Sequence, residues 1–143
     1  MTTNGNLVGT LVTELAANSQ FKDITFVEAY ENDIKPTPLT KPIAALSVKR
    51  CEIGDLLTVT LDTGEIRTTN SRPVETTVSI DIYMPYSMGG SEGHRLFDKI
   101  ATFLLFTKKH DISKVVCGNA DYDKNCQAIV LRSTFVFDNT VSA

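Results

Sequence analysis

The sequence has no excess of basic residues, no long apolar run and few side chains that form disulfides or metal sites. Its 143 residues include 14 Lys and Arg against 17 Asp and Glu, which gives a net charge of −3. Binding to nucleic acid through bulk electrostatics needs a basic surface, so this composition argues against it. The start of the chain has no basic stretch followed by a long apolar one, so we expect no signal peptide. The longest uninterrupted apolar runs, such as residues 103–106, are far too short to span a bilayer.

Cysteine is scarce. Cys51, Cys117 and Cys126 are an odd number, and no two of them form a CxxC pair. A disulfide framework normally uses an even number of cysteines. We therefore interpret all three as free thiols of a protein made in a reducing compartment, the cytoplasm.

No motif brings together groups for catalysis or metal binding. A nucleophilic cysteine needs a base, but no local signature links a cysteine to His94 or His110, and buried inert cysteine is the commoner outcome. The spacing of the histidines and of Cys117 and Cys126 does not match structural zinc sites. The glycines in residues 89–93 lack the lysine of a phosphate-binding P-loop. We therefore expect no enzyme activity, no catalytic, cofactor-binding or metal-binding residue, and no cofactor.

The composition is that of an ordinary globular protein. Hydrophobic residues make up 42% of the chain and charged residues 22%, so disorder is not indicated. A chain of this length buries about two thirds of its unfolded surface. We expect a single domain over residues 1–143.

We expect the fold to be organised around residues 75–106. Apolar and polar side chains alternate over residues 76–84, which is typical of a strand with one buried face. Pro85 ends this strand, and a glycine turn follows. Ser91 stands at the N-cap position of a helix whose apolar stripe comprises Phe97, Ile100, Ala101 and Leu104. A strand with an amphipathic helix folded back over it indicates an α+β layer.

The other elements follow from the same periodicities. An apolar stripe from Leu7 to Ala16 predicts a first helix, capped by Asn4 or Asn6. It carries one charge on its polar face, which leaves two interpretations open: a weakly charged surface helix, or one that contacts another subunit. Further strands are predicted at residues 24–30, 43–50, 56–61, 115–117 and 126–137. Residues 31–42, with three prolines, are expected to form a loop, and residues 62–73 a hairpin tip or long loop.

Two features suggest contact with other molecules. The last strand, residues 126–137, is apolar on both faces, which is typical of a strand covered on both sides, here either by this chain or by a neighbour. Phe106 falls on the polar side of the second helix. Either that helix ends before Phe106, or the ring protrudes toward a partner.

The order of these elements, the chain length and two segments carry a family resemblance. The segments are SIDIYMPYSMGGSEGHRLFDKIATFLL, residues 79–105, and CQAIVLRSTFVFDN, residues 126–139. Together they resemble the tail terminator proteins of long-tailed bacteriophages and of phage-tail-like particles. The resemblance covers nearly the whole chain as an arrangement of elements. That family has no short invariant motif, so it assigns no role to any single residue.

The resemblance implies an α+β fold with a mixed, mainly antiparallel β-sheet, two α-helices packed on one face, and an extended hairpin or loops. It implies a virion structural protein that forms a hexameric ring, caps the tail tube, stops its polymerisation and offers a surface to the head or neck. The implied partners are copies of itself, the tail tube protein and a head or neck connector, with a sheath protein as a further candidate. DNA passes through such a ring without sequence-specific contacts, and no membrane is involved. The implied location is the head-proximal end of the tail in the virion, after synthesis in the bacterial cytoplasm.

A ring requires two different patches on each subunit, meeting head to tail. Two polar loops and one aromatic residue supply the candidates for the subunit interface, namely Glu31, Asp33, Lys35, Glu65, Arg67, Arg72 and Phe106.

Two other functions stay open from sequence. The chain could be a different tail or neck component, such as a tube, head–tail connector or baseplate subunit. It could also be a cytoplasmic ligand-binding or enzymatic domain, which would require a concave pocket with converging polar groups.

Overall fold

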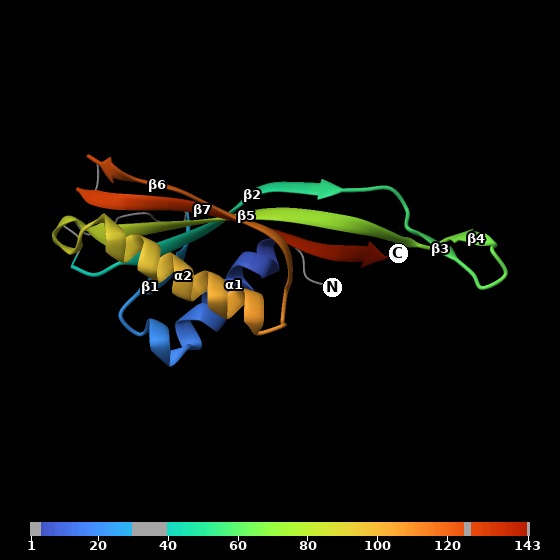
Figure 1. Cartoon of the computed structure of the whole chain (residues 1–143), viewed down its shortest axis with the longest axis horizontal. Coiled ribbons are helices and arrows are strands. Elements are labelled where there is room, and N and C mark those ends of the chain that lie inside the picture. Colours follow the sequence, from blue (N-terminus) through green and yellow to red (C-terminus); the bar gives the residue numbers. More distant parts are fainter. Residues whose placement is uncertain (1–3, 30–39, 125–126, 143) are drawn as a thin grey trace.

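The computed structural model describes residues 4–29, 40–124 and 127–142, and shows two helices lying on one face of a twisted β-sheet (Figure 1). The elements in chain order are α1 (Asn4–Ala17), a 3₁₀ turn η1 (Ser19–Phe21), β1 (Thr25–Glu28), β2 (Ile43–Ile53), β3 (Thr58–Thr60), β4 (Ile66–Thr68), β5 (Ser71–Pro85), a 3₁₀ turn η2 (Tyr86–Met88), α2 (Gly90–Phe106), β6 (Asp111–Asp123) and β7 (Ala128–Ser142).

Five of the described strands form the main sheet, in the order β1-β2-β5-β7-β6. β1 runs parallel to β2, and every other neighbouring pair is antiparallel. The remaining two strands, β3 and β4, pair with each other in a separate small hairpin. The predicted fold class is therefore confirmed: an α+β protein with a mixed, mainly antiparallel sheet and both helices on one face.

The core lies between the helices and the sheet. On β5 the predicted alternation holds, because Val78, Ile80, Ile82 and Met84 are all almost fully buried beneath the helices. β7 contributes Leu131, Phe135 and Phe137 to the same layer, and the helices add Leu11, Leu15, Ile100 and Leu104.

The 3₁₀ turn after α1 adds a core residue that periodicity did not reveal. Asn18 accepts a hydrogen bond from the backbone N–H of Gln20, which closes a turn just where α1 stops. The turn buries Phe21, whose ring meets those of Phe26 and Phe103 edge-on at 5.8 Å. Phe21 thus joins the end of α1 to β1 and to α2.

Three local interpretations are corrected. α2 begins at Gly90 with Gly89 as its N-cap at φ 79°, so Ser91 lies within the first turn rather than at the cap. The strand predicted at residues 115–117 continues through residues 118–121 as part of β6, where the register shifts between Cys117 and Ala120. Residues 71–73, expected in a loop, begin β5.

The last strand is covered on both sides only near its start. Ala128 and Val130 are buried on the face away from the helices, where Ala128 packs with Ile43. Farther along this face Arg132 is exposed. Among the described residues, the sheet face opposite the helices is therefore buried at Ala45, Ser79 and Val130 and exposed at Arg132.

Candidate assembly surfaces

A long extension carries the chain past the helices at one end of the sheet. β2 and β5 continue there as partners, and the chain between them, residues 53–70, forms what we call the arm, with the β3–β4 hairpin at its tip (Figure 1). β7 supports the base of this extension, because Ser142 pairs with Ser71 at its far end.

Backbone hydrogen bonds define the arm. The Gly54 N–H donates to the Pro73 carbonyl at 2.8 Å, and the Leu57 N–H donates to Ser71 at 2.7 Å. The Thr69 N–H and hydroxyl both donate to the Leu57 carbonyl, each at 2.8 Å. An added Cβ on Gly54 would lie 2.9 Å from the Pro73 side chain, so this base tolerates only glycine without a shift.

The arm has no core of its own. None of its residues is buried, yet it carries five large hydrophobic side chains that are substantially exposed: Ile53, Leu56, Leu57, Val59 and Ile66. Ile66, with 68% of its surface exposed, is the extreme case. An isolated two-stranded hairpin is marginally stable in water, and clustered exposed apolar side chains mark interaction sites. The arm is therefore the strongest candidate for contact with another molecule.

A second apolar patch, which we call the end patch, lies at the opposite end of the sheet. It consists of Tyr86, Met88 and Tyr122, which are 69%, 43% and 54% exposed. The two tyrosine rings meet edge-on, with centroids 5.7 Å apart. The register fixes its position: Pro85 and Asp123 both pair with Ala128 at this end, whereas Ser71 pairs with Ser142 at the arm end.

The sequence-predicted interface residues are distributed as follows. Glu65 and Arg67 flank Ile66 at the arm tip, both largely exposed. Arg72 lies at the base of the arm, where it donates a 3.1 Å hydrogen bond to the Gly54 carbonyl and so has an internal role. Phe106 is the last residue of α2 and is 76% exposed, so the helix does not end before it, and contact of its ring with a partner stays a prediction. Glu31, Asp33 and Lys35 lie outside the described residues.

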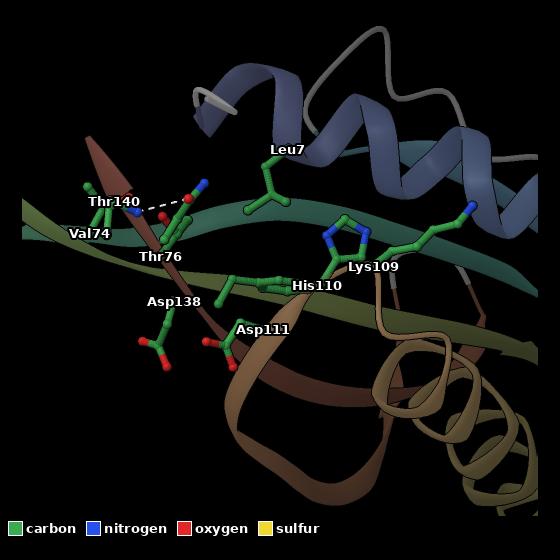
Figure 2. A pocket seen from close by; sticks show the side chains of 10 residues that line it. Leu7, Val74, Thr76, Lys109, His110, Asp111, Asp138 and Thr140 are labelled. Carbon is green, nitrogen blue, oxygen red and sulfur yellow. Dashed lines mark hydrogen bonds between the residues drawn. The ribbon is translucent and has the colours of Figure 1, made fainter. Parts of the chain in front are cut away.

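A cavity of about 310 Å³ lies where α1 meets the strands leading to the arm (Figure 2). Leu7 projects from α1 toward the strands, with Thr76 and the His110 ring on the facing side. His110 Nε2 lies 2.8 Å from the Glu14 carboxylate, and both side chains are mostly buried. This contact ties α1 to the start of β6, so it gives His110 a role in holding the fold.

The described cysteines include one close to a histidine, which the sequence did not indicate. Cys117 Sγ lies 3.9 Å from His94 Nδ1, because β6 passes beside the first half of α2. Burial, with a contribution from the Asp98 carboxylate, raises the pKa of the Cys117 thiol above its ordinary value. A raised pKa disfavours the nucleophilic thiolate. This arrangement therefore does not favour thiol catalysis.

Within the described ranges, no three His, Cys, Asp or Glu side chains are grouped so that they could hold a metal ion. The same ranges contain no helix with the length and apolar character needed to cross a membrane.

Comparison with known proteins assigns no role to these surfaces. No protein-family model matches the chain, and no curated protein matches it.

Proposed function

We propose that this chain is a structural subunit that associates with copies of itself into a ring and acts as a tail terminator. In that role the ring caps the finished tail tube, stops its polymerisation and presents a surface to the head or neck. The proposed location is the head-proximal end of a phage or phage-tail-like particle.

The observation that carries the proposal is the arm. Complete burial of one large apolar side chain is worth ~1.5–3 kcal/mol, and association costs several kcal/mol in lost freedom. One exposed apolar side chain therefore means little, but five on a projecting element without a core can supply a net favourable contact. The specific role as terminator rests on the resemblance of the two quoted segments and of the element order.

Self-association can be tested by native mass spectrometry over a range of concentrations, with the double variant Val59→Ser/Ile66→Ser as the comparison. Both side chains are exposed, so the variant should keep its melting temperature. We expect wild type to form a ring and the variant to dissociate at least ~10-fold more readily, since about 1.4 kcal/mol of lost burial changes an equilibrium constant tenfold. Equal assembly of the two proteins would remove the arm from the interface.

The terminator role needs a second experiment, with a tail tube protein from the phage or phage-tail-like particle to which this chain would belong. Wild type added during tube growth should stop elongation and appear in electron micrographs as a cap at one end. Incorporation along the whole tube would instead identify a tube subunit. Unchanged growth without a bound cap would contradict the terminator role whatever the chain's own oligomeric state.

A ligand-binding function is the second candidate, and the cavity beside His110 favours it. It has the size of a small-molecule site, with Leu7 and Phe137 as apolar lining and Lys109 among its polar groups. The His110–Glu14 contact commits one ring nitrogen to holding the fold, which is why we rank this candidate below assembly.

A further inference from the structure

We propose that the arm of one copy docks on the end patch of the next copy, with β4 lying antiparallel along the free edge of β6. This inference rests on the proposed self-assembly and names the two surfaces that meet. Because the arm and the end patch are different surfaces of one chain, their contact is head to tail and generates a ring when the rotation closes.

The positions of the two surfaces favour this pairing. They lie at opposite ends of the long strands β5 and β7, so an arm that projects beyond its own sheet points away from its own end patch (Figure 1). The arm exposes branched aliphatic side chains, and the end patch exposes two tyrosines and a methionine. Tyrosine is enriched among the residues that dominate the binding energy of protein interfaces.

Both strands lie at the edge of a sheet. Among the described strands, β6 has β7 as its one sheet neighbour and β4 has β3. A strand edge with free N–H and C=O groups is a template for another strand, and addition of a strand to a sheet edge is a common mode of recognition.

The alternation of side chains matches on the two edges. Ile66 and Arg67 are neighbours on β4, so they project to opposite faces of the hairpin, as Tyr122 and Asp121 do on β6. An antiparallel alignment that sets Ile66 against Tyr122 therefore also sets Arg67 against Asp121. In this alignment Glu65 lies beside Asp123, with Lys124 next in sequence to offset the like charge.

The charges on both sides are available for exchange. Arg67 is 3.6 Å from Glu65, and Asp121 is 3.8 Å from Arg132, so both existing ion pairs are loose. All four side chains are more than half exposed. Exposed pairs of this kind add little affinity, but they fix the register of an interface.

The other exposed apolar site fits the arm less well. Leu105 and Phe106 at the end of α2 are followed by Lys108 and Lys109, both exposed. This surface carries the two lysines and one carboxylate, that of Asp111, so the lysines would weaken its attraction for Arg67. Beside the end patch, Asp121 lies at the position that the proposed alignment sets against Arg67.

Cysteine cross-linking tests the register directly. In a chain whose three native cysteines are replaced by serine, Ile66→Cys and Tyr122→Cys are made as separate variants and mixed under mild oxidation. Directly opposed residues on antiparallel strands lie within the Cα separation that a disulfide requires. We expect a covalent dimer in the mixture and little product from either variant alone.

The matched control replaces Tyr122→Cys with Val116→Cys, an exposed position on the same strand, six residues from Tyr122. It should cross-link to Ile66→Cys at least ~10-fold more slowly. Equal rates for the two partners would overturn the proposed alignment.

Complementary variants test the interface without cross-linking. Val59→Ser/Ile66→Ser has a defective arm, and Tyr86→Ser/Tyr122→Ser has a defective end patch. We expect each to be a monomer that still unfolds cooperatively, with the melting temperature that wild type has when diluted to the monomer. Mixed in equal amounts they should form dimers and nothing larger, because each dimer has one intact interface and two defective outer surfaces.

The outcomes separate this inference from the proposed function. Rings formed by the end-patch variant, beside rings formed by wild type, would overturn the docking inference and leave self-assembly standing. A wild type that stays monomeric at every concentration would overturn both.

Discussion

Neighbouring residues on β5 lie on opposite faces of the sheet and have different surroundings. Ile80 on β5 is 1% exposed and lies in the layer between the sheet and the helices. One position earlier, Ser79 lies on the other face of the strand, where its hydroxyl donates to Asp81 at 2.9 Å. Ser79 is also buried, at 6% exposed, so this position accepts a polar side chain because its hydroxyl is hydrogen-bonded, whereas the Ile80 position does not offer a charged group a partner.

Ile80→Asp should abolish folding. The substitution buries a carboxylate without a partner, and that cost is comparable with the whole stability of about 5–15 kcal/mol of a small domain. Circular dichroism and thermal melting would show the loss of the cooperative transition. Thr77→Asp, on the opposite and half-exposed face of β5, is the control and should fold. An unchanged melting temperature for Ile80→Asp would contradict the assigned register.

Cys117 should react slowly with thiol reagents. Burial raises the pKa of its thiol, so the thiolate is disfavoured in the folded state. The fraction of Cys117 present as thiolate increases only at pH values above the ordinary pKa of a cysteine thiol. Alkylation with iodoacetamide at pH 8, followed by peptide mass spectrometry, should modify exposed Cys51 first. Faster modification of Cys117 would instead indicate an activated thiol beside His94.

The raised pKa also makes the stability of the fold depend on pH. At pH values above about 9 the unfolded chain loses the Cys117 thiol proton more readily than the folded chain, so Cys117 lowers the stability there.

At the scale of elements, four neighbouring strands place like charges opposite one another. The register sets Glu52 of β2, Glu75 of β5, Asp138 of β7 and Asp111 of β6 in one row across the sheet, near the base of the arm. Glu52 has a nearby cation in Arg50, at 3.3 Å. Like charges directly opposed on adjacent strands destabilise a sheet.

Glu75→Gln should therefore stabilise the isolated chain, by about 0.2–1 kcal/mol for each opposed pair relieved. Glu75 is an informative position because, like Asp138, it faces a carboxylate on both sides. Urea unfolding at low ionic strength should show the gain, and the gain should shrink in 0.5 M salt because the charges are exposed and screened. Glu65→Gln, at the arm tip beside Arg67, is the matched control and should show no such gain.

At the scale of the molecule, the helix-covered sheet and the arm are separable. The arm adds no buried side chain, whereas the sheet contains the main described core beneath the helices and a smaller cluster around Ile43 and Ala128 on its other face. Ile53 and Val74 are register partners at the base of the arm, so a two-residue turn can join β2 directly to β5 there.

Replacing residues 54–73 with Asn-Gly should leave a folded protein. Asn-Gly favours the tight hairpin turn that this register requires. We expect a cooperative melting transition within a few degrees of wild type, measured by calorimetry, and a monomer by light scattering. Loss of the transition would show that the arm stabilises the body, contrary to its lack of buried residues.

Periodic apolar patterns account for what could be predicted. The stripes of α1 and α2 and the alternation on β5 each repeat over enough residues to identify the element and its buried face. β6 was underestimated because it lies at the sheet edge, where polar residues such as Lys114 and Asn119 break the alternation, and Gly118-Asn119 looks like a turn. Phe21 was missed because a three-residue turn has no period.

The assembly surfaces were only partly accessible from sequence. Glu65 and Arg67 were identified as candidates because they lie in a polar loop, and the arm does carry them. Leu56, Leu57 and Val59 were not, because an apolar residue on a predicted strand is normally assigned to a core. Ile53 and Ile66 fell outside the predicted strands, where no periodic pattern marks them. Met88, Tyr86 and Tyr122 come from two separate segments, so no local pattern groups them.

The sequence by itself determined the local elements and the class of the fold, because the spacing of apolar residues is a property of each segment alone. The tertiary structure decided the strand order, the length of the edge strand and which apolar residues stay uncovered. Whether a side chain is buried depends on what lies against it, and for the arm nothing in the described chain does. The same leucine and isoleucine types that stabilise the core beneath the helices are, on the arm, a surface that a neighbour can cover.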